Sequence, residues 1–328
     1  MSDAPIRFGT LGAARIAPMA LLRPAREVSG VQVDAVAARD RSRAEKFASK
    51  HGIPRVHGCY DDLVSDPAID AIYNPLPNSH HAEWTIRALE AGKHVLCEKP
   101  LAANASEAEQ MRDAAERSGR VLMEAFHWRY HPLAARMLEV VASGELGDVR
   151  HIEAVFCIPL LRPGDIRYRL DLAGGATMDA GCYPLHMVRT LAGAEPDVVS
   201  ARALLASPGV DRRMEAELRF PDGRTGRIVC SLFSRSLLRI GARVLGDAGE
   251  MRVFNPLAPH LHHRLTVNTG DGRRRERLKG DATYTCQLRA FRAAVRDGAP
   301  VPTDAASGVL NMRAIDSVYR AAGLPLRG

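Results

Sequence analysis

Over residues 6–125, short apolar runs alternate with stretches of helical periodicity. The apolar runs are residues 6–8, 31–37, 71–73, 94–97 and 121–123. The amphipathic stretches between them are residues 42–51, 81–91 and 106–118. Ser42 and Ser106 are each followed three residues later by a glutamate, which is the capping-box pattern of a helix start. Strands that alternate with helices predict a parallel, doubly wound sheet.

The pattern changes after about Trp128, where strands follow each other without intervening helices. The expected strands are residues 149–158, 214–220, 226–230, 239–245 and 250–254. Asp222-Gly223 is a hairpin turn signal between two of them. Helices are expected near the end of the chain, over residues 284–297 and 305–322. This part predicts an α+β domain built on a mostly antiparallel, open sheet.

Length and composition agree with two domains in one globular chain. The chain has 328 residues, which favours an α/β domain over residues 1–127 and an α+β domain over residues 128–328. No apolar run is long enough to span a bilayer, and the first residues lack a signal pattern. The six cysteines form no CxxC pair. We therefore expect a cytoplasmic protein with reduced thiols and no membrane partner.

The net charge of +7 is compatible with an anionic ligand or a nucleic-acid surface. The densest basic run, Arg273–Arg275, lies between glycine-containing turns, which is typical of a solvated hairpin or loop. No helix-turn-helix, zinc-finger or RNA-recognition pattern accompanies it. His260, His262 and His263 lack the spacing of a structural zinc site. We expect neither a nucleic-acid partner nor a metal.

A glycine turn follows the first apolar run. Gly12 permits a tight turn between strand and helix, and the amides that follow can face a pyrophosphate, helped by the helix dipole. The residues that would form this phosphate-facing turn are Gly12, Ala13, Ala14, Arg15 and Ile16. Ala14 replaces the second glycine of the usual dinucleotide fingerprint. A merely tight turn between strand and helix is therefore an alternative.

The end of the second strand bears on the choice between NADP and NAD. An NAD-selective site usually ends this strand with a carboxylate that holds the ribose hydroxyls. Here Ala37-Ala38 is followed by Arg39, which could lie against adenine and pair with a 2′-phosphate. Arg39 indicates NADP, whereas an inward-turned Asp40 would favour NAD. A surface position for Arg39 is the remaining alternative.

Lys99 follows the apolar run 94–97 by two residues and stands directly before Pro100. A side chain at the carboxyl end of a parallel strand points into the ligand crevice of an open α/β sheet. A lysine there can hold a substrate oxygen or move a proton. The turn that includes Pro77 and Asn78 follows another strand end and can cover the nicotinamide end of a cofactor.

A second rich segment, residues 174–186, offers a carboxylate, a phenol and an imidazole near a helix start. Asp179 and Tyr183 are four residues apart and can share a helical face. A phenol beside a lysine ammonium can have a lowered pKa, which suits proton transfer. A capping aspartate and a buried tyrosine are the structural alternative.

These motifs together resemble the Gfo/Idh/MocA family of nicotinamide-dependent oxidoreductases over nearly the whole length. The motifs that carry the resemblance are residues 9–17, Pro77-Asn78 with His81, residues 91–100, residues 124–132 and residues 174–183. The chain looks most like the branch that holds dihydrodiol dehydrogenases, NADP-dependent D-xylose dehydrogenases and glucose–fructose oxidoreductase. The resemblance implies an N-terminal Rossmann domain and a C-terminal open sheet that pairs copies into a homodimer or homotetramer.

The resemblance also implies roles for individual residues. Lys99 would be the catalytic lysine, Glu98 would lie near the nicotinamide ribose, and a cis peptide would precede Pro100. Tyr183 stands where many members have a histidine, and would be the acid/base, with Asp179 orienting substrate or lysine. His81 would contact the cofactor. The residues expected to bind substrate are Arg129, Arg167 and His186, with the loop 160–171 shaping the pocket.

The expected function is hydride transfer between NADP, with NAD as the alternative, and a secondary alcohol of a small-molecule sugar or cyclic diol. Two other functions stay open. An NAD-dependent glycosidase would work through transient oxidation with tightly held cofactor. A sensor would bind nucleotide and sugar without chemistry, and would have no need of the Lys99–Tyr183 pair.

Overall fold

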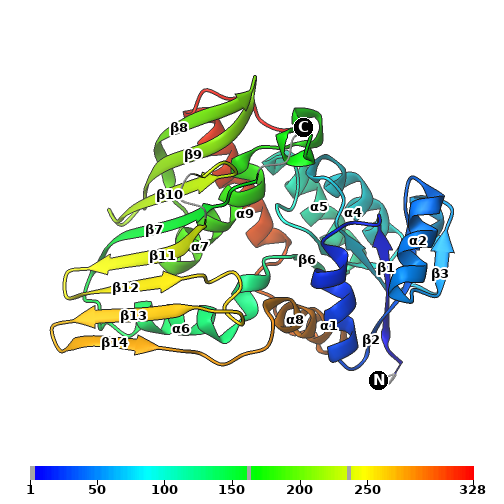
Figure 1. Cartoon of the computed structure of the whole chain (residues 1–328), viewed down its shortest axis with the longest axis horizontal. Helices are drawn as coiled ribbons and strands as arrows, with labels where there is room; N and C mark the ends of the chain where they lie inside the picture. Colours follow the sequence, from blue (N-terminus) through cyan, green and yellow to red (C-terminus); the bar gives the residue numbers. More distant parts are fainter. Residues whose placement is uncertain (1–3, 161–163, 235–237) are drawn as a thin grey trace. The chain divides into compact units, whose positions relative to one another are not determined.

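The computed structural model describes residues 4–160, 164–234 and 238–328, so residues 161–163 of the expected substrate loop lie outside the described part. The chain forms two compact units (Figure 1). The first unit holds Met1–His127 and Tyr284–Val309, and the second holds Trp128–Thr283 and Leu310–Gly328. The first division falls after residue 127, as expected, whereas residues 284–309 were expected in the other domain.

The first unit is built on a six-stranded parallel sheet in the order β3-β2-β1-β4-β5-β6. Its strands are β1 (Ile6–Leu11), β2 (Val31–Ala37), β3 (Arg55–His57), β4 (Ala71–Asn74), β5 (His94–Cys97) and β6 (Leu122–Glu124). Its helices include α1 (Arg23–Glu27), α2 (Arg41–His51), α3 (Tyr60–Ser65), α4 (His81–Glu90) and α5 (Ala105–Ser118). The predicted parallel, doubly wound sheet is confirmed.

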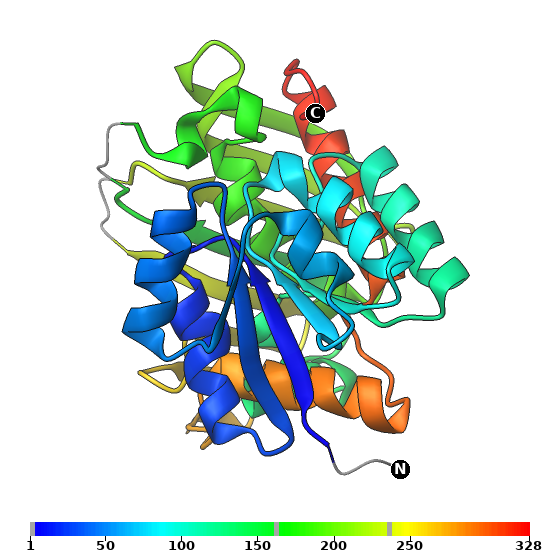
Figure 2. The same cartoon turned by 90° about the vertical axis from the view of Figure 1, so that its right-hand side faces the viewer.

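Helix α8 (Thr283–Asp297), orange in Figure 2, belongs to the first unit from Tyr284 onward. Its Phe291 is fully buried, with its ring 5.3 Å from that of Phe8 on β1. Thr303, further along the same segment, exchanges backbone and side-chain hydrogen bonds with Glu124 on β6, at 2.8 and 2.7 Å. The apolar face of an amphipathic helix packs against a matching apolar surface. The sequence pattern predicted the helix but did not identify which domain provides that surface.

Two helix starts differ from the capping boxes expected at Ser42 and Ser106. Helix α2 is capped by Asp40, whose carboxylate accepts from the amides of Ser42 and Arg43 at 2.9 and 3.4 Å. Helix α5 is capped by Asn104, two residues before Ser106. Serine is a suitable capping residue at both positions. The free amides of the first helical turn instead donate to a short polar side chain that lies two residues earlier, nearer the preceding strand.

The second unit is built on an eight-stranded sheet in the order β14-β13-β12-β11-β7-β10-β9-β8. Its strands are β7 (Val149–Cys157), β8 (Asp197–Ser207), β9 (Val210–Arg219), β10 (Thr225–Ser231), β11 (Arg239–Gly246), β12 (Gly249–Phe254), β13 (Arg264–Thr269) and β14 (Gly272–Glu276). Only β7 and β10 are parallel among its paired neighbours in the described residues. The predicted mostly antiparallel sheet and the hairpin at Asp222-Gly223 are confirmed.

Helix α7 (Cys182–Ala192) lies against β7, β10 and β11, and nearly all of its side chains are buried. A short π-helical turn, η6 (Thr177–Gly181), leads into it. Helices α6 (Pro132–Ala142) and α9 (Ala305–Ala321) complete the helical part (Figure 1). No helix in the described residues is long and apolar enough to cross a membrane.

Candidate functional site

The glycine turn lies at the carboxyl end of β1, the end of a parallel strand at which ligands of open α/β sheets bind. Gly12 adopts a φ of 83°, which disfavours any residue with a Cβ. Its amide donates to Ala37 at the end of β2, at 2.6 Å. The next residues, from Ala13 to Ile16, are exposed or half-buried before the helical turn that begins at Pro18. The turn therefore fits a phosphate-bearing cofactor at this edge.

Arg39 and Asp40 follow β2 at the same edge and face different partners. Arg39 is exposed and lies near the Tyr60 phenol, whose pKa is raised by burial and lowered in part by the Arg39 charge. Asp40 is turned toward its own helix, because its carboxylate also accepts from the Ser42 hydroxyl at 2.8 Å. These hydrogen bonds lower the pKa of Asp40.

The Glu98-Lys99-Pro100 turn follows β5 directly. The Glu98 amide donates to the Asn74 carbonyl at 3.0 Å, and the side chain accepts from the Tyr73 hydroxyl at 2.7 Å. Glu98 is 8% exposed, while Lys99 is half-buried. The peptide between Lys99 and Pro100 is cis, so that expectation is confirmed. Burial first, and then the Glu98 charge, raise the pKa of Tyr73, which keeps the phenol a donor.

His81 joins this turn to the one after β4. Its ring nitrogens lie 2.9 Å from the Pro100 carbonyl oxygen and 2.8 Å from that of Leu76. Burial lowers the pKa of His81 to about 4, so the ring is neutral near pH 7 and donates one proton. Asn74 supports the same turn through the Thr85 hydroxyl at 3.1 Å. Pro77 and Asn78 stay half-buried beside it.

Tyr73 is a residue that sequence reasoning missed. It fixes the carboxylate of Glu98, and it is completely buried in β4. The available signal was a tyrosine in an otherwise apolar strand, because a buried phenol requires a hydrogen-bond partner. Nothing in the sequence says which partner it has, since Glu98 lies 25 residues away.

In the second unit, Asp179 and Arg167 come together. Their ion pair, Nε to Oδ2, measures 2.8 Å, and the Asp179 charge raises the pKa of Arg167. Arg167 also pairs with the buried Asp165 at 3.1 Å. Asp179 lies on η6 and Tyr183 in the first turn of α7, as the expected shared helix requires. Asp179 therefore orients an arginine whose side chain is 40% exposed.

Tyr183, His186 and Arg129 differ in exposure. Tyr183 is 5% exposed, and its ring meets Phe156 edge-on at 5.5 Å. His186 is 2% exposed against Trp128, and burial holds its pKa well below the usual range. Arg129 is half-buried, which lowers its pKa. The roles expected for these residues, and the pairing of Tyr183 with Lys99 of the first unit, stay predictions.

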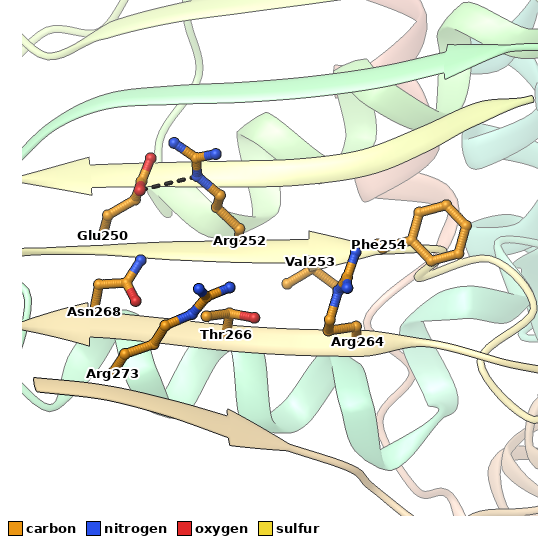
Figure 3. Close-up of a pocket in the computed structure, with 8 residues that line it drawn as sticks. All are labelled: Glu250, Arg252, Val253, Phe254, Arg264, Thr266, Asn268 and Arg273. Atoms are coloured by element: carbon orange, nitrogen blue, oxygen red, sulfur yellow. Dashed lines mark ion pairs between the residues drawn. The ribbon is translucent and has the colours of Figure 1, made fainter. Parts of the chain in front are cut away.

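A separate cavity of about 460 Å³ lies on the β12–β13–β14 part of the second sheet (Figure 3). Its lining residues are Glu250, Arg252, Val253, Phe254, Arg264, Thr266, Asn268 and Arg273. Arg252 pairs with Glu250 at 2.9 Å, which is the dashed line in Figure 3. None of the expected site residues lines this cavity. Arg273–Arg275 belongs to the β13–β14 hairpin, as expected.

The described residues contain no group of three or more metal-ligating side chains placed to hold an ion. His263 instead contacts the Pro259 carbonyl at 2.9 Å and accepts from the Leu278 amide at 3.0 Å. Its ring is used in holding a loop.

Sequence profiles match both parts of the chain. The profile described as "Oxidoreductase family, NAD-binding Rossmann fold" matches residues 6–126, and the "GFO/IDH/MocA C-terminal domain" matches residues 134–252. The chain belongs to the Gfo/Idh/MocA oxidoreductase family. The resemblance stated from the motifs is thus confirmed, and with it the NAD(P)-binding Rossmann fold of the first unit.

Three proteins illustrate the similarity of this chain to known oxidoreductases. The NADP-dependent D-xylose 1-dehydrogenase 2 of Haloferax volcanii is 37% identical over 96% of this chain and 97% of its own. The trans-1,2-dihydrobenzene-1,2-diol dehydrogenase of Sus scrofa is 36% identical over 69% of this chain and 67% of its own. A 3-ketoreductase from Actinomadura kijaniata, solved with NADP and TDP-benzene, has a TM-score of 0.89 at 30% identity, covering 97% and 98%. That ketoreductase has also been solved with a tyrosine replaced by phenylalanine and with a lysine replaced by alanine.

Proposed function

We propose that this chain is an NADP-dependent oxidoreductase that acts on a secondary alcohol of a sugar or cyclic diol, with Lys99 and Tyr183 as its acid/base pair. The observation that carries the proposal is the Glu98-Lys99-Pro100 turn at the carboxyl end of β5, on the same end of the six-stranded parallel sheet as the glycine turn after β1. Relatives named for D-xylose and dihydrodiol oxidation support the substrate class.

Gly12 and the residues that follow it would hold the cofactor's pyrophosphate, and Arg39 would pair with a 2′-phosphate. Asp40 supports the NADP choice, because one oxygen of its carboxylate already accepts from the amide and hydroxyl of Ser42 at the start of α2. When bound, nicotinamide supplies the hydride acceptor or donor. The protein positions the reacting groups and supplies the charges around them.

In alcohol oxidation Tyr183, held as a phenolate by the charge of Lys99, takes the hydroxyl proton of the substrate and becomes a neutral phenol. Asp179 and Arg167 orient the substrate through their ion pair. Glu98, held by Tyr73, keeps the backbone around Lys99 in place. Arg129 and His186 complete the proposed substrate side.

The first experiment titrates the protein with NADPH and NADH, and follows nucleotide fluorescence. We expect tighter, exchangeable binding of NADPH, and Arg39→Ala should weaken NADPH far more than NADH. Arg41→Ala is the matched control, because Arg41 is an exposed arginine paired with Glu45 in the same helix start. Equal loss for both nucleotides, or a preference for NADH, would contradict the Arg39 assignment. Retained, non-exchanging NAD would favour the glycosidase alternative.

Turnover then tests the acid/base pair, with aldoses and diols screened in the presence of NADP. Lys99→Met and Tyr183→Phe should each lower kcat by about 10²–10⁴-fold, the usual contribution of a general acid/base, while NADPH still binds. Full turnover in either variant would overturn the assignment of that residue. Binding of nucleotide and sugar by the wild-type protein without turnover would instead favour a sensor.

We further propose that the face of the second sheet turned away from α7 pairs with a second copy of the chain. Arg227 on this face meets Glu153, Glu215 and Glu217 at 3.2–3.4 Å, so much of its charge is matched within one copy. Sedimentation velocity would test the pairing, and a monomer at micromolar concentration would contradict it. The cytoplasmic location stays a prediction.

A further inference from the structure

The start of the segment that carries Asp179 and Tyr183 is hydrogen-bonded to a buried carboxylate on a strand distant in the sequence. Asp211, on β9, is completely buried, and its Oδ2 accepts from both the amide and the hydroxyl of Thr177, each at 2.7 Å. Thr177 is the first residue of η6, the turn that leads into α7. Asp211 therefore fixes the point at which this segment starts.

The other oxygen of Asp211 binds the end of the chain. Its Oδ1 accepts from the Tyr319 hydroxyl at 2.9 Å and from the Arg327 guanidinium at 3.1 Å. Arg327 is the penultimate residue, yet its side chain is 0% exposed. Its Nε donates to the Gly174 carbonyl at 2.8 Å, and the guanidinium lies 4.0 Å from the centre of the Tyr319 ring. The C-terminal arginine thus holds the same segment directly at Gly174 and through Asp211 at Thr177.

The backbone of the segment also packs closely against Asp211 and Tyr319 at Gly175. Gly175 adopts a φ of 136°, and a Cβ there would collide with the Asp211 carboxylate and lie 2.8 Å from the Tyr319 hydroxyl. The Gly175 amide donates to the Arg167 carbonyl at 2.8 Å, and its carbonyl accepts from the Asp179 amide at 3.0 Å. Asp179 is therefore linked to the buried Asp211–Arg327 pair through Gly175 and the adjoining Gly174, whose carbonyl accepts from Arg327.

Stability alone does not explain such a pair. Desolvating two charges costs several kcal/mol, and well-packed apolar residues often stabilise a fold as much or more. What a fully hydrogen-bonded pair adds is one defined geometry, since each donor on the arginine fork has its own acceptor. Here one acceptor, the Gly174 carbonyl, is on the segment that leads to Tyr183, and another, Asp211, binds Thr177 of the same segment.

We propose that Arg327, Asp211 and Tyr319 are positioning residues that set the placement of Asp179 and Tyr183 for the reaction. This inference rests on the proposed function, because it assigns the pair a task in that chemistry. It makes the end of the chain part of the support of the catalytic segment. Removal or weakening of the arginine fork shifts η6, and Tyr183 moves with it.

The test is Arg327→Lys, which keeps the charge but loses the planar fork. We expect kcat to fall by about 10- to 100-fold, since a displacement near 1 Å can cost about 10²-fold, while NADPH affinity is unchanged. In alcohol oxidation the pH of half-maximal kcat should rise, because a displaced Tyr183 is less well stabilised as phenolate. Tyr319→Phe removes one donor and leaves the ion pair, so a smaller change in the same direction is expected.

Arg189→Met is the matched control. Arg189 is also buried, at 6% exposure, and it secures the opposite end of α7 through Glu195 at 2.5 Å and Asn311 at 3.1 Å. Its loss should lower the unfolding temperature without changing the pH profile. If Arg327→Lys behaves like Arg189→Met, with kcat and pH profile of the wild type well below its unfolding temperature, the positioning role is overturned.

Tyr183→Phe separates the two proposals. If Tyr183→Phe keeps full turnover, the proposed function fails, whatever Arg327→Lys does. If Tyr183→Phe is inactive and both Arg327→Lys and Tyr319→Phe keep the wild-type kcat and pH profile, only the positioning inference fails. Should Arg327→Lys not fold, Tyr319→Phe alone decides, because it leaves the buried charges paired.

Discussion

The two parts of the candidate site are held in different ways. In the first unit, Glu98 and Lys99 follow a strand end and are held by neighbouring strand ends and loops, through Tyr73, Asn74 and His81. In the second unit, the turn before Tyr183 is held by the Asp211–Arg327 pair. These two residues lie 34 and 150 positions after Thr177 in the chain. The first arrangement is mostly main chain and neutral donors, and the second depends on buried charge.

This difference predicts different sensitivities. A main-chain turn keeps its geometry when one side chain is lost, because the strand ends on both sides remain paired. A buried ion pair has no such reserve, since removing one partner leaves an uncompensated charge in the core. The second part of the site should therefore fail first when its supporting side chains are changed.

The largest expected effect is that of Asp211→Ala. Arg327 would stay buried without its carboxylate, and the loss should be about 3–5 kcal/mol of unfolding free energy. Urea unfolding followed by circular dichroism measures it. Asp222→Ala, which breaks the exposed Asp222–Arg224 pair of a hairpin, is the control and should leave the midpoint unchanged. A loss below about 1 kcal/mol for Asp211→Ala would contradict the comparison.

Acid should act on the second unit through another ion-pair group. Hydrogen bonds from Arg136 first, and then from Arg274, lower the pKa of Glu276 to about 2. Because the folded-state pKa lies below the usual value, Glu276 stabilises the fold above about pH 4.5 and this part is lost as the pH falls toward 2. Glu276→Gln should lower stability at pH 7 by about 1–3 kcal/mol and flatten its decline between pH 5 and 2. Urea midpoints at several pH values measure this decline, and the same slope in Glu276→Gln as in the wild type would disprove the assignment.

The smallest expected effect on turnover is that of Tyr73→Phe in the first unit. It removes the hydroxyl that donates to Glu98, so the unfolding free energy should fall by about 1.5–3 kcal/mol, the range for a hydrogen bond to a charged group. We expect kcat to fall less than in Arg327→Lys, because the Glu98 backbone stays bonded to Asn74. Steady-state kinetics of the two variants side by side would refute the comparison if Tyr73→Phe were the more damaged enzyme.

Much of the first unit was readable because its signals are local. The strands at residues 31–37 and 94–97 were found with the observed limits, and the turn at Gly12 lies where the strand-to-helix pattern put it. The caps at Asp40 and Asn104 were missed by two residues, since several short polar side chains compete for the same amides. Short elements such as β3 and α3 have too few residues for a periodic signal.

The sequence by itself determined the doubly wound sheet, the antiparallel second sheet, the family and the residues that are candidates for chemistry. The two sheets follow from side-chain periodicity and turn chemistry within a few neighbouring residues, whereas the family follows from the resemblance of the motifs to those of its members. Only the tertiary structure decided that α8 packs with the first unit and that Arg327 and Asp211 meet at Thr177. Such contacts join residues far apart in the chain, and their partners are selected by the packing of whole elements rather than by any local pattern.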